Sequence, residues 1–71
     1  MPIMTNATQN DVKQVIDRAA KFTRLWIAMQ YAFAYSANVR RRVMLGDDGR
    51  FWVVTPADAS RLEKAGYEYA N

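Results

Sequence analysis

Three consecutive arginines, Arg40-Arg41-Arg42, are the residues of this sequence with the clearest potential for chemistry. In a strand, Arg40 and Arg42 share one face and Arg41 lies on the other. Cations beside an aromatic ring are typical of surfaces that bind single-stranded nucleic acid. The candidate nucleic-acid residues are therefore Arg40, Arg42, Arg50 and Trp52. The structural alternative is that these arginines cover the sheet with their stems, pair with carboxylates or stack on the tryptophan.

Arg41 would then lie on the core face of its strand, between two valines. A buried guanidinium must be paired, because an uncompensated charge is costly to remove from water. Asp58 and Glu63 in the last predicted helix are the candidate partners.

Histidine and cysteine are both absent from the chain, which removes most catalytic and metal-binding chemistry. Imidazole is the usual general base near neutral pH, and zinc sites use His and Cys ligands. We therefore expect no enzyme, no cofactor, no metal and no small-molecule substrate. The Gly46-Asp47-Asp48-Gly49 segment has two carboxylates but lacks the further oxygen ligands of a calcium loop. It is interpreted as a turn.

Charge and hydropathy argue against a membrane protein. The net charge is +3, which allows only weak attraction to phosphates or anionic lipid. The most apolar run, residues 25–35, is much shorter than the roughly 20 residues needed to span a bilayer. We expect a cytoplasmic protein with a flexible N-terminus at residues 1–9.

Residues 11–37 contain neither Gly nor Pro and predict one long helix. Its apolar residues recur at spacings of three and four and form one stripe. Such a helix would be roughly 40 Å long, whereas a compact domain of this size is roughly 29 Å across. The overhanging stripe predicts a protein interface with a second copy or another protein partner. The predicted interface residues are Val15, Phe22, Trp26, Met29, Tyr31, Phe33 and Tyr35.

Residues 39–45 and 50–55 predict two antiparallel strands joined by the Gly-Asp-Asp-Gly turn. The turn allows two registers, and we favour the one with a bulge at Gly49, which pairs Leu45 with Phe51. This register makes a core face of Val43, Leu45, Phe51 and Val53. The opposite face collects Arg40, Arg42, Met44 and Trp52.

A short C-terminal helix is predicted from its capping signals. Thr55 is a suitable N-cap and Pro56 a suitable first helical residue. Gly66 can end the helix in a left-handed conformation, with Tyr67 packing on Leu62. The alternation after Gly66 predicts at most a very short terminal strand.

The expected fold class is therefore α+β: a long N-terminal helix, a two-stranded antiparallel hairpin and a short C-terminal helix, in one small domain of residues 10–71. We expect a non-enzymatic protein-protein interaction module that forms a homodimer through the first helix or binds another protein there. The alternatives are a small nucleic-acid-binding regulator that uses the hairpin face, and a stoichiometric protein inhibitor.

Overall fold

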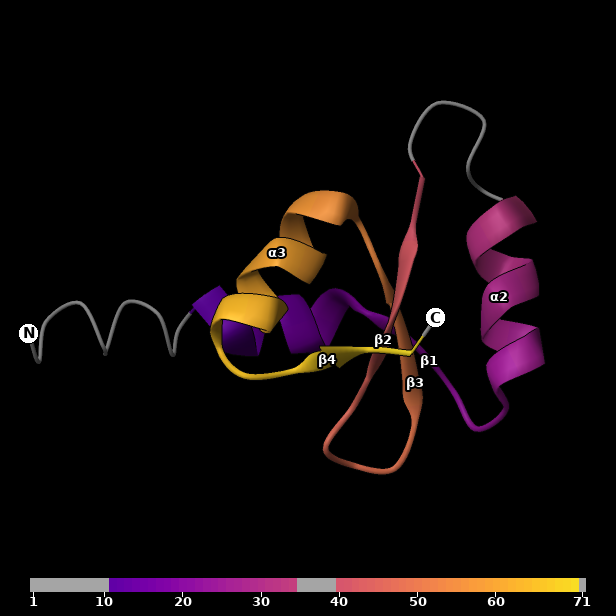
Figure 1. Ribbon diagram of the computed structural model, residues 1–71, viewed down its shortest axis with the longest axis horizontal. Coiled ribbons are helices and arrows are strands. Elements are labelled where there is room, and N and C mark those ends of the chain that lie inside the picture. Colours follow the sequence, from indigo (N-terminus) through magenta and orange to yellow (C-terminus); the bar gives the residue numbers. More distant parts are fainter. Residues whose placement is uncertain (1–10, 35–39, 71) are drawn as a thin grey trace, which may run out of the picture.

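The computed structural model describes residues 11–34 and 40–70, and these residues form an α+β fold (Figure 1). Residues 11–18 are helical. The elements that follow are β1 (Ala20–Phe22), α2 (Leu25–Ala34), β2 (Arg42–Leu45), β3 (Phe51–Val54), α3 (Pro56–Lys64) and β4 (Glu68–Tyr69). The expected α+β class is confirmed. The flexible N-terminus predicted for residues 1–9 lies outside the described residues.

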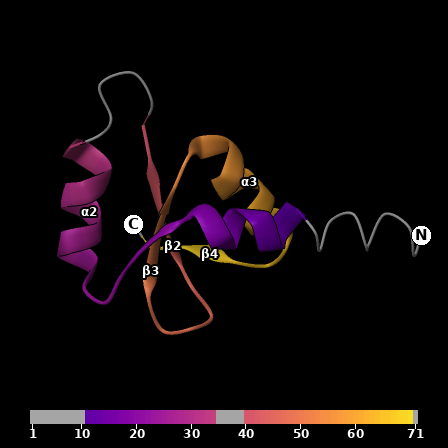
Figure 2. The same ribbon diagram turned by 180° about the vertical axis from the view of Figure 1, so that it is seen from behind.

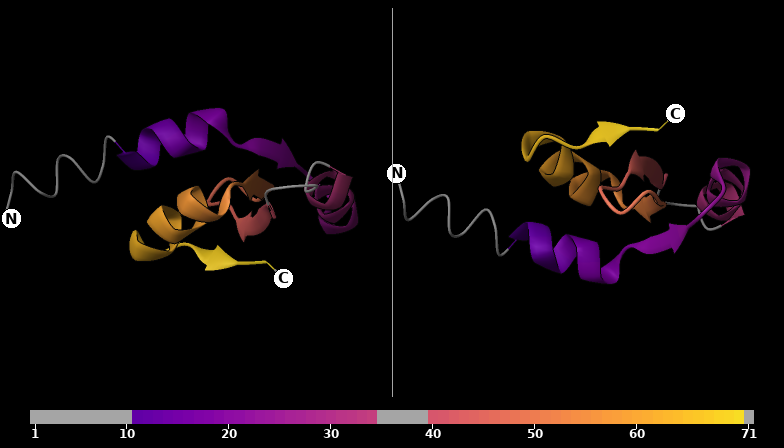
Figure 3. Two further views of the ribbon diagram at one scale, coloured as in Figure 1. Left: turned by 90° about the horizontal axis from the view of Figure 1, so that it is seen from above. Right: turned by 90° about the horizontal axis from the view of Figure 1, so that it is seen from below.

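The four strands form one antiparallel sheet in the order β1-β3-β2-β4. Helix α2 covers one face of this sheet, while the helix of residues 11–18 and α3 lie on the other (Figures 1 and 2). The views from above and below show the same three layers (Figure 3). Both sheet faces are thus covered, in a chain of only 71 residues.

The prediction of one uninterrupted helix over residues 11–37 is wrong. The first helix ends at residue 18, where the ammonium of Lys21 donates to the carbonyl of Ile16 at 2.5 Å. The chain then forms β1, which pairs with β3 in the register Ala20↔Val53. A continuous helix could cover only one sheet face, whereas the break allows coverage of both. Tertiary pairing therefore outweighs local helix propensity in a segment without a helix breaker.

The predicted hairpin register is confirmed. Val43 pairs with Val53 and Leu45 with Phe51. The backbone N–H of Gly46 donates to the carbonyl of Arg50 at 2.8 Å. Gly49 has a φ of +79°, the left-handed conformation that the bulged turn requires.

The assignment of one core face and one open face to the hairpin is wrong. Met44 and Trp52 were expected on the open face, but they are buried at 0% and 1% exposure. They pack with Val15, Ala59 and Leu62 from the helices on that side. Leu45, expected in the core, is 41% exposed. Met44 and Trp52 are buried because the helix of residues 11–18 and α3 cover their face of the sheet. The sequence pattern had left this face uncovered.

A second cluster lies under α2. Val43 and Val53 of the sheet pack against Ala28 and Ala32 of the helix, and all four residues are buried. The sheet therefore separates two small apolar clusters.

The predicted caps of the last helix are confirmed. The Oγ1 of Thr55 accepts a hydrogen bond from the backbone N–H of Asp58 at 3.3 Å, and Pro56 begins α3. At the other end, the N–H of Gly66 donates to Glu63 and the N–H of Tyr67 to Leu62, both at 3.0 Å. These two bonds define a Schellman motif. The short terminal strand is present as β4, paired with β2.

Within residues 11–34 and 40–70, no helix has the length and apolar character needed to cross a membrane.

Candidate functional site

The solvent-facing side of α2 carries Trp26 and Phe33, two of the three exposed large apolar residues in the described part of the chain. Trp26 and Phe33 are 58% and 71% exposed. They lie seven positions apart and therefore on the same side of the helix, two turns from each other. Gln30, also exposed, lies between them on this side. We call Trp26, Gln30 and Phe33 the α2 outer face.

The inner side of α2 is built from small residues, which is consistent with the exposure of Trp26 and Phe33. Ala28 and Ala32 are its buried residues, and they contact the valines of β2 and β3. Small residues let the helix axis approach the sheet closely, so bulky side chains are placed on the remaining surface. The helix carries no acidic residue in its first turn and no basic residue in its last turn. Its sequence, LWIAMQYAFA, has no charged residue at all.

The structure divides the predicted interface residues into separate groups. Val15 is fully buried in the core of its own chain. Phe22 and Tyr31 pack against each other, with ring centroids 5.1 Å apart. Trp26 and Phe33 are both exposed, whereas Met29 is half-buried and packs against the apolar cluster under α2. Tyr35 lies outside the described residues.

The four candidate nucleic-acid residues are not brought together on one open face. Trp52 is buried, and its Nε1–H donates to Asp48 at 3.1 Å, so its ring offers no stacking surface. Arg42 lies over the ring of Tyr69 at 4.8 Å. Arg50 pairs with Asp48 at 3.5 Å, while Arg40 is exposed. Trp52 therefore does not provide the exposed ring that the nucleic-acid hypothesis assigned to it.

The carboxylates of the hairpin turn have structural partners. Asp48 accepts from the backbone N–H of Arg50 at 3.0 Å as well as from Trp52. Asp47 accepts from the hydroxyl of Tyr67 at 3.0 Å. Burial is the main cause that raises the pKa of this Tyr67 hydroxyl, and the nearby Asp47 adds to it. Within the described part of the chain, no group of three or more acidic residues is arranged to hold a metal ion.

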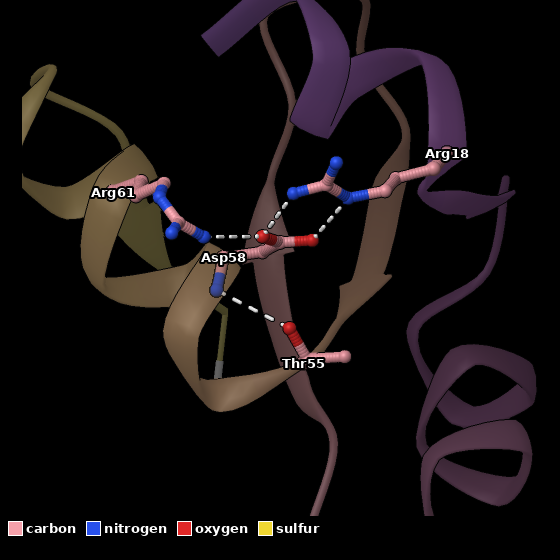
Figure 4. A network of polar contacts seen from close by, with 4 residues as sticks. All are labelled: Arg18, Thr55, Asp58 and Arg61. Carbon is pink, nitrogen blue, oxygen red and sulfur yellow. Dashed lines mark hydrogen bonds and ion pairs between the residues drawn. The ribbon is translucent and has the colours of Figure 1, made fainter. Parts of the chain in front are cut away.

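A buried carboxylate and two arginines form a polar network (Figure 4). Asp58 is only 4% exposed. Arg18 donates two hydrogen bonds to this carboxylate, from Nε to Oδ2 at 2.8 Å and from Nη2 to Oδ1 at 2.6 Å. Arg61 adds a third, from Nη1 to Oδ1 at 2.9 Å. The network ties the helix of residues 11–18 to α3.

The hydrogen bonds from Arg18 are the main cause that lowers the pKa of Asp58 below its ordinary value. Burial acts in the opposite direction but is outweighed. In return, the bond to Asp58 raises the pKa of Arg18. The carboxylate is therefore held ionised, as charge-assisted bonds require.

A pocket of about 300 Å³ opens beside this network. Its polar lining consists of Arg18, Arg41, Thr55, Asp58 and Arg61. We call it the arginine pocket. Arg41 lines the same pocket as Asp58, which was one of its two expected partners. The hydrogen bonds described above for that carboxylate come from Arg18 and Arg61.

Sequence reasoning missed Arg18 and Arg61. The second was within reach, because residues three apart on a helix face one another and Arg61 follows Asp58 by three. Arg18 comes from 40 positions earlier in the chain, and no local signal pointed to it.

Comparisons with protein-family models, with curated proteins and with solved structures gave no match to this chain.

Proposed function

We propose that this chain is a non-enzymatic protein-binding module that associates with a second copy of itself through the α2 outer face. The observation that carries this proposal is the outward placement of Trp26 and Phe33, 58% and 71% exposed, on a helix without charged residues. Tryptophan is enriched at the energetic centres of protein interfaces. Association would remove this apolar surface from water, which is favourable.

The chemistry of the α2 outer face supports a second copy as the occupant. The face has no charge with which to select an oppositely charged partner, and an apolar stripe is complementary to itself. In a two-fold dimer the same patch meets its own copy, so that a residue at one end contacts a residue at the other end. Two antiparallel α2 helices would set Trp26 of one copy against Phe33 of the other.

The size of the domain gives a second reason for association. A chain of this length buries only about 60% of its unfolded surface. Small domains often gain stability from disulfides, metals or oligomerisation. This chain contains no cysteine, so a disulfide is not available.

The dimensions of α2 limit the strength of the dimer. Its ten residues span about 15 Å. An interface built on one such helix buries less than the roughly 800 Å² per partner of a stable complex. We therefore expect a dimer that forms and dissociates with concentration.

The test is the solution mass of the full chain, measured by light scattering and sedimentation from low micromolar concentration to about 1 mM, where even interfaces of about −4 kcal/mol are half formed. The wild type should move from 8.2 kDa toward twice that mass. The double variant Trp26→Ser/Phe33→Ser should remain monomeric. Leu45→Ser is the matched control, because Leu45 is also an exposed large apolar residue but lies on the hairpin.

A wild type that is monomeric throughout this range would contradict self-association. A dimer that survives the double variant but is lost in Leu45→Ser would place the interface on the hairpin. In the first case, the stoichiometric-inhibitor hypothesis would become the leading one, with a different protein on the α2 outer face.

A further inference from the structure

We propose that the arginine pocket is a binding site for a small phosphate monoester in its doubly charged form. Three guanidinium groups line the pocket, from Arg18, Arg41 and Arg61, against the single carboxylate of Asp58. These residues come from three separate parts of the chain: the first helix, the segment before β2, and α3. The side chains of the lining are thus mainly cationic, which favours an anionic ligand such as a phosphate dianion. This proposal does not depend on self-association.

Arg18 and Arg61 retain donors for such a ligand. A guanidinium has five N–H donors. The bonds measured for Arg18 and Arg61 use two and one of them, all on Asp58. Their side chains are 53% and 49% exposed, so both arginines are accessible to a ligand from solvent.

Asp58 acts as the orienting group of the site. The carboxylate is buried and accepts bonds from both neighbouring arginines, which fixes the direction of their planar forks. Arginine forks match the spacing of phosphate oxygens and bind them in a bidentate manner. A ligand would therefore meet side chains that are already held in place, which lowers the entropy cost of binding.

The first turn of α3 adds to the favourable potential. Thr55 and Ala57 line the same pocket, at the N-terminal end of that helix. The helix dipole is positive at this end and favours an anion. The Thr55 side chain already bonds the N–H of Asp58, so the remaining contribution of the helix is mainly its potential.

The size of the pocket favours a small ligand over nucleic acid. About 300 Å³ lies at the lower end of the range for small-molecule sites and accommodates a phosphate with a short substituent. Nucleic-acid binding would need a track of cations along the backbone and surfaces on which bases stack. The buried Trp52 does not supply such a surface.

The test is an NMR titration of the full chain with methyl phosphate at about pH 8, where a phosphate monoester is doubly charged. Sodium chloride at equal ionic strength is the reference. The resonances of Arg18, Arg41, Thr55 and Arg61 should shift in a saturable manner with methyl phosphate but not with chloride.

Arg41→Gln is the main variant, because Arg41 lines the pocket while the measured bonds to Asp58 come from other residues. Arg40→Gln is its matched control: it removes the same charge one position away, at an exposed residue that is not part of the lining. Arg41→Gln should weaken methyl phosphate binding by at least about tenfold, as the loss of a charge-assisted bond implies. Arg40→Gln should weaken it by less than about twofold.

Three results would overturn the proposal. The first is that sodium chloride causes the same resonance shifts in the wild type as methyl phosphate. The arginines would then serve only to bind Asp58. The second is equal weakening by Arg40→Gln and Arg41→Gln, which would indicate diffuse attraction. The third is binding of a single-stranded oligonucleotide that methyl phosphate does not displace. The wild-type titration decides the question even where a variant does not fold.

Discussion

The ionisation of Asp58 is linked to the stability of the fold. Its folded-state pKa lies below the ordinary value, because Arg18 and Arg61 stabilise the carboxylate. Its contribution is therefore complete above an unfolded-state pKa of about 3.9 and is lost as the pH falls through the lower folded-state pKa. We expect the free energy of unfolding, measured with urea between about pH 5 and pH 2, to fall more steeply in the wild type than in Asp58→Asn.

Asp58→Asn should also cost about 1.5–3 kcal/mol at neutral pH, because the bonds to both arginines lose their charge. Asp17→Asn is the control, since Asp17 is an exposed carboxylate of the first helix, next to Arg18. Its acid profile should follow that of the wild type. Identical profiles for Asp58→Asn and the wild type would show that Asp58 does not contribute to acid unfolding.

The two tryptophans differ strongly in exposure. Trp26, predicted as an interface residue, is 58% exposed, whereas Trp52, predicted on the hairpin face with the arginines, is 1% exposed. Trp52→Ala should therefore cost about 3–5 kcal/mol of unfolding free energy. Trp26→Ala should cost about 0.5 kcal/mol or less. Both values should be measured at low protein concentration, so that association does not contribute, and equal costs would contradict the structure.

At the scale of elements, the close approach of α2 to the sheet depends on its small inner residues. Ala28 is fully buried against the valines of the sheet. Ala28→Leu should overfill this contact and reduce the unfolding free energy by about 1–3 kcal/mol. Ala34→Leu is the matched control, because Ala34 is exposed at the end of the same helix. Its effect should stay within about 0.5 kcal/mol, and a similar loss in both variants would argue against close packing at Ala28.

The elements that the sequence predicted correctly are those defined by local signals. The register of the hairpin follows from a turn of four residues, and the ends of α3 follow from Thr55, Pro56 and Gly66. Each of these signals acts within a few positions of the element it defines, and so they can be read without knowledge of the fold.

The division of the first helix could not be predicted in this way. Residues 19–24 contain no helix breaker, and β1 forms because its backbone pairs with β3, some 30 positions later. The same limit applies to the candidate sites. The sequence predicted Trp26 and Phe33 as interface residues on a longer helix, and the structure shows both exposed on α2. It did not identify the arginine pocket, because the pocket exists only once the first helix, the segment before β2 and α3 are packed together.

At the scale of the whole molecule, a sheet of short strands is covered on both faces by helices, and its apolar residues are divided between two small clusters. Each cluster is small, so the domain should be only marginally stable on its own. Trp26 and Phe33 of α2 nevertheless leave apolar surface exposed to solvent. In a self-associating protein, that surface would contribute to stability in proportion to the logarithm of concentration.

Thermal unfolding of the wild type should therefore depend on protein concentration. Above the dissociation constant of the dimer, each tenfold increase in concentration should raise the Tm by about 3–6 °C, since dimer formation stabilises only the folded chain. The measurement is circular dichroism or calorimetry over several decades of concentration. The Trp26→Ser/Phe33→Ser variant should show a constant Tm, and Leu45→Ser should retain the slope of the wild type. A wild-type Tm that does not change with concentration would show that association through α2 contributes nothing to the folded state, whereas a slope that persists in the double variant would assign the contact to another surface.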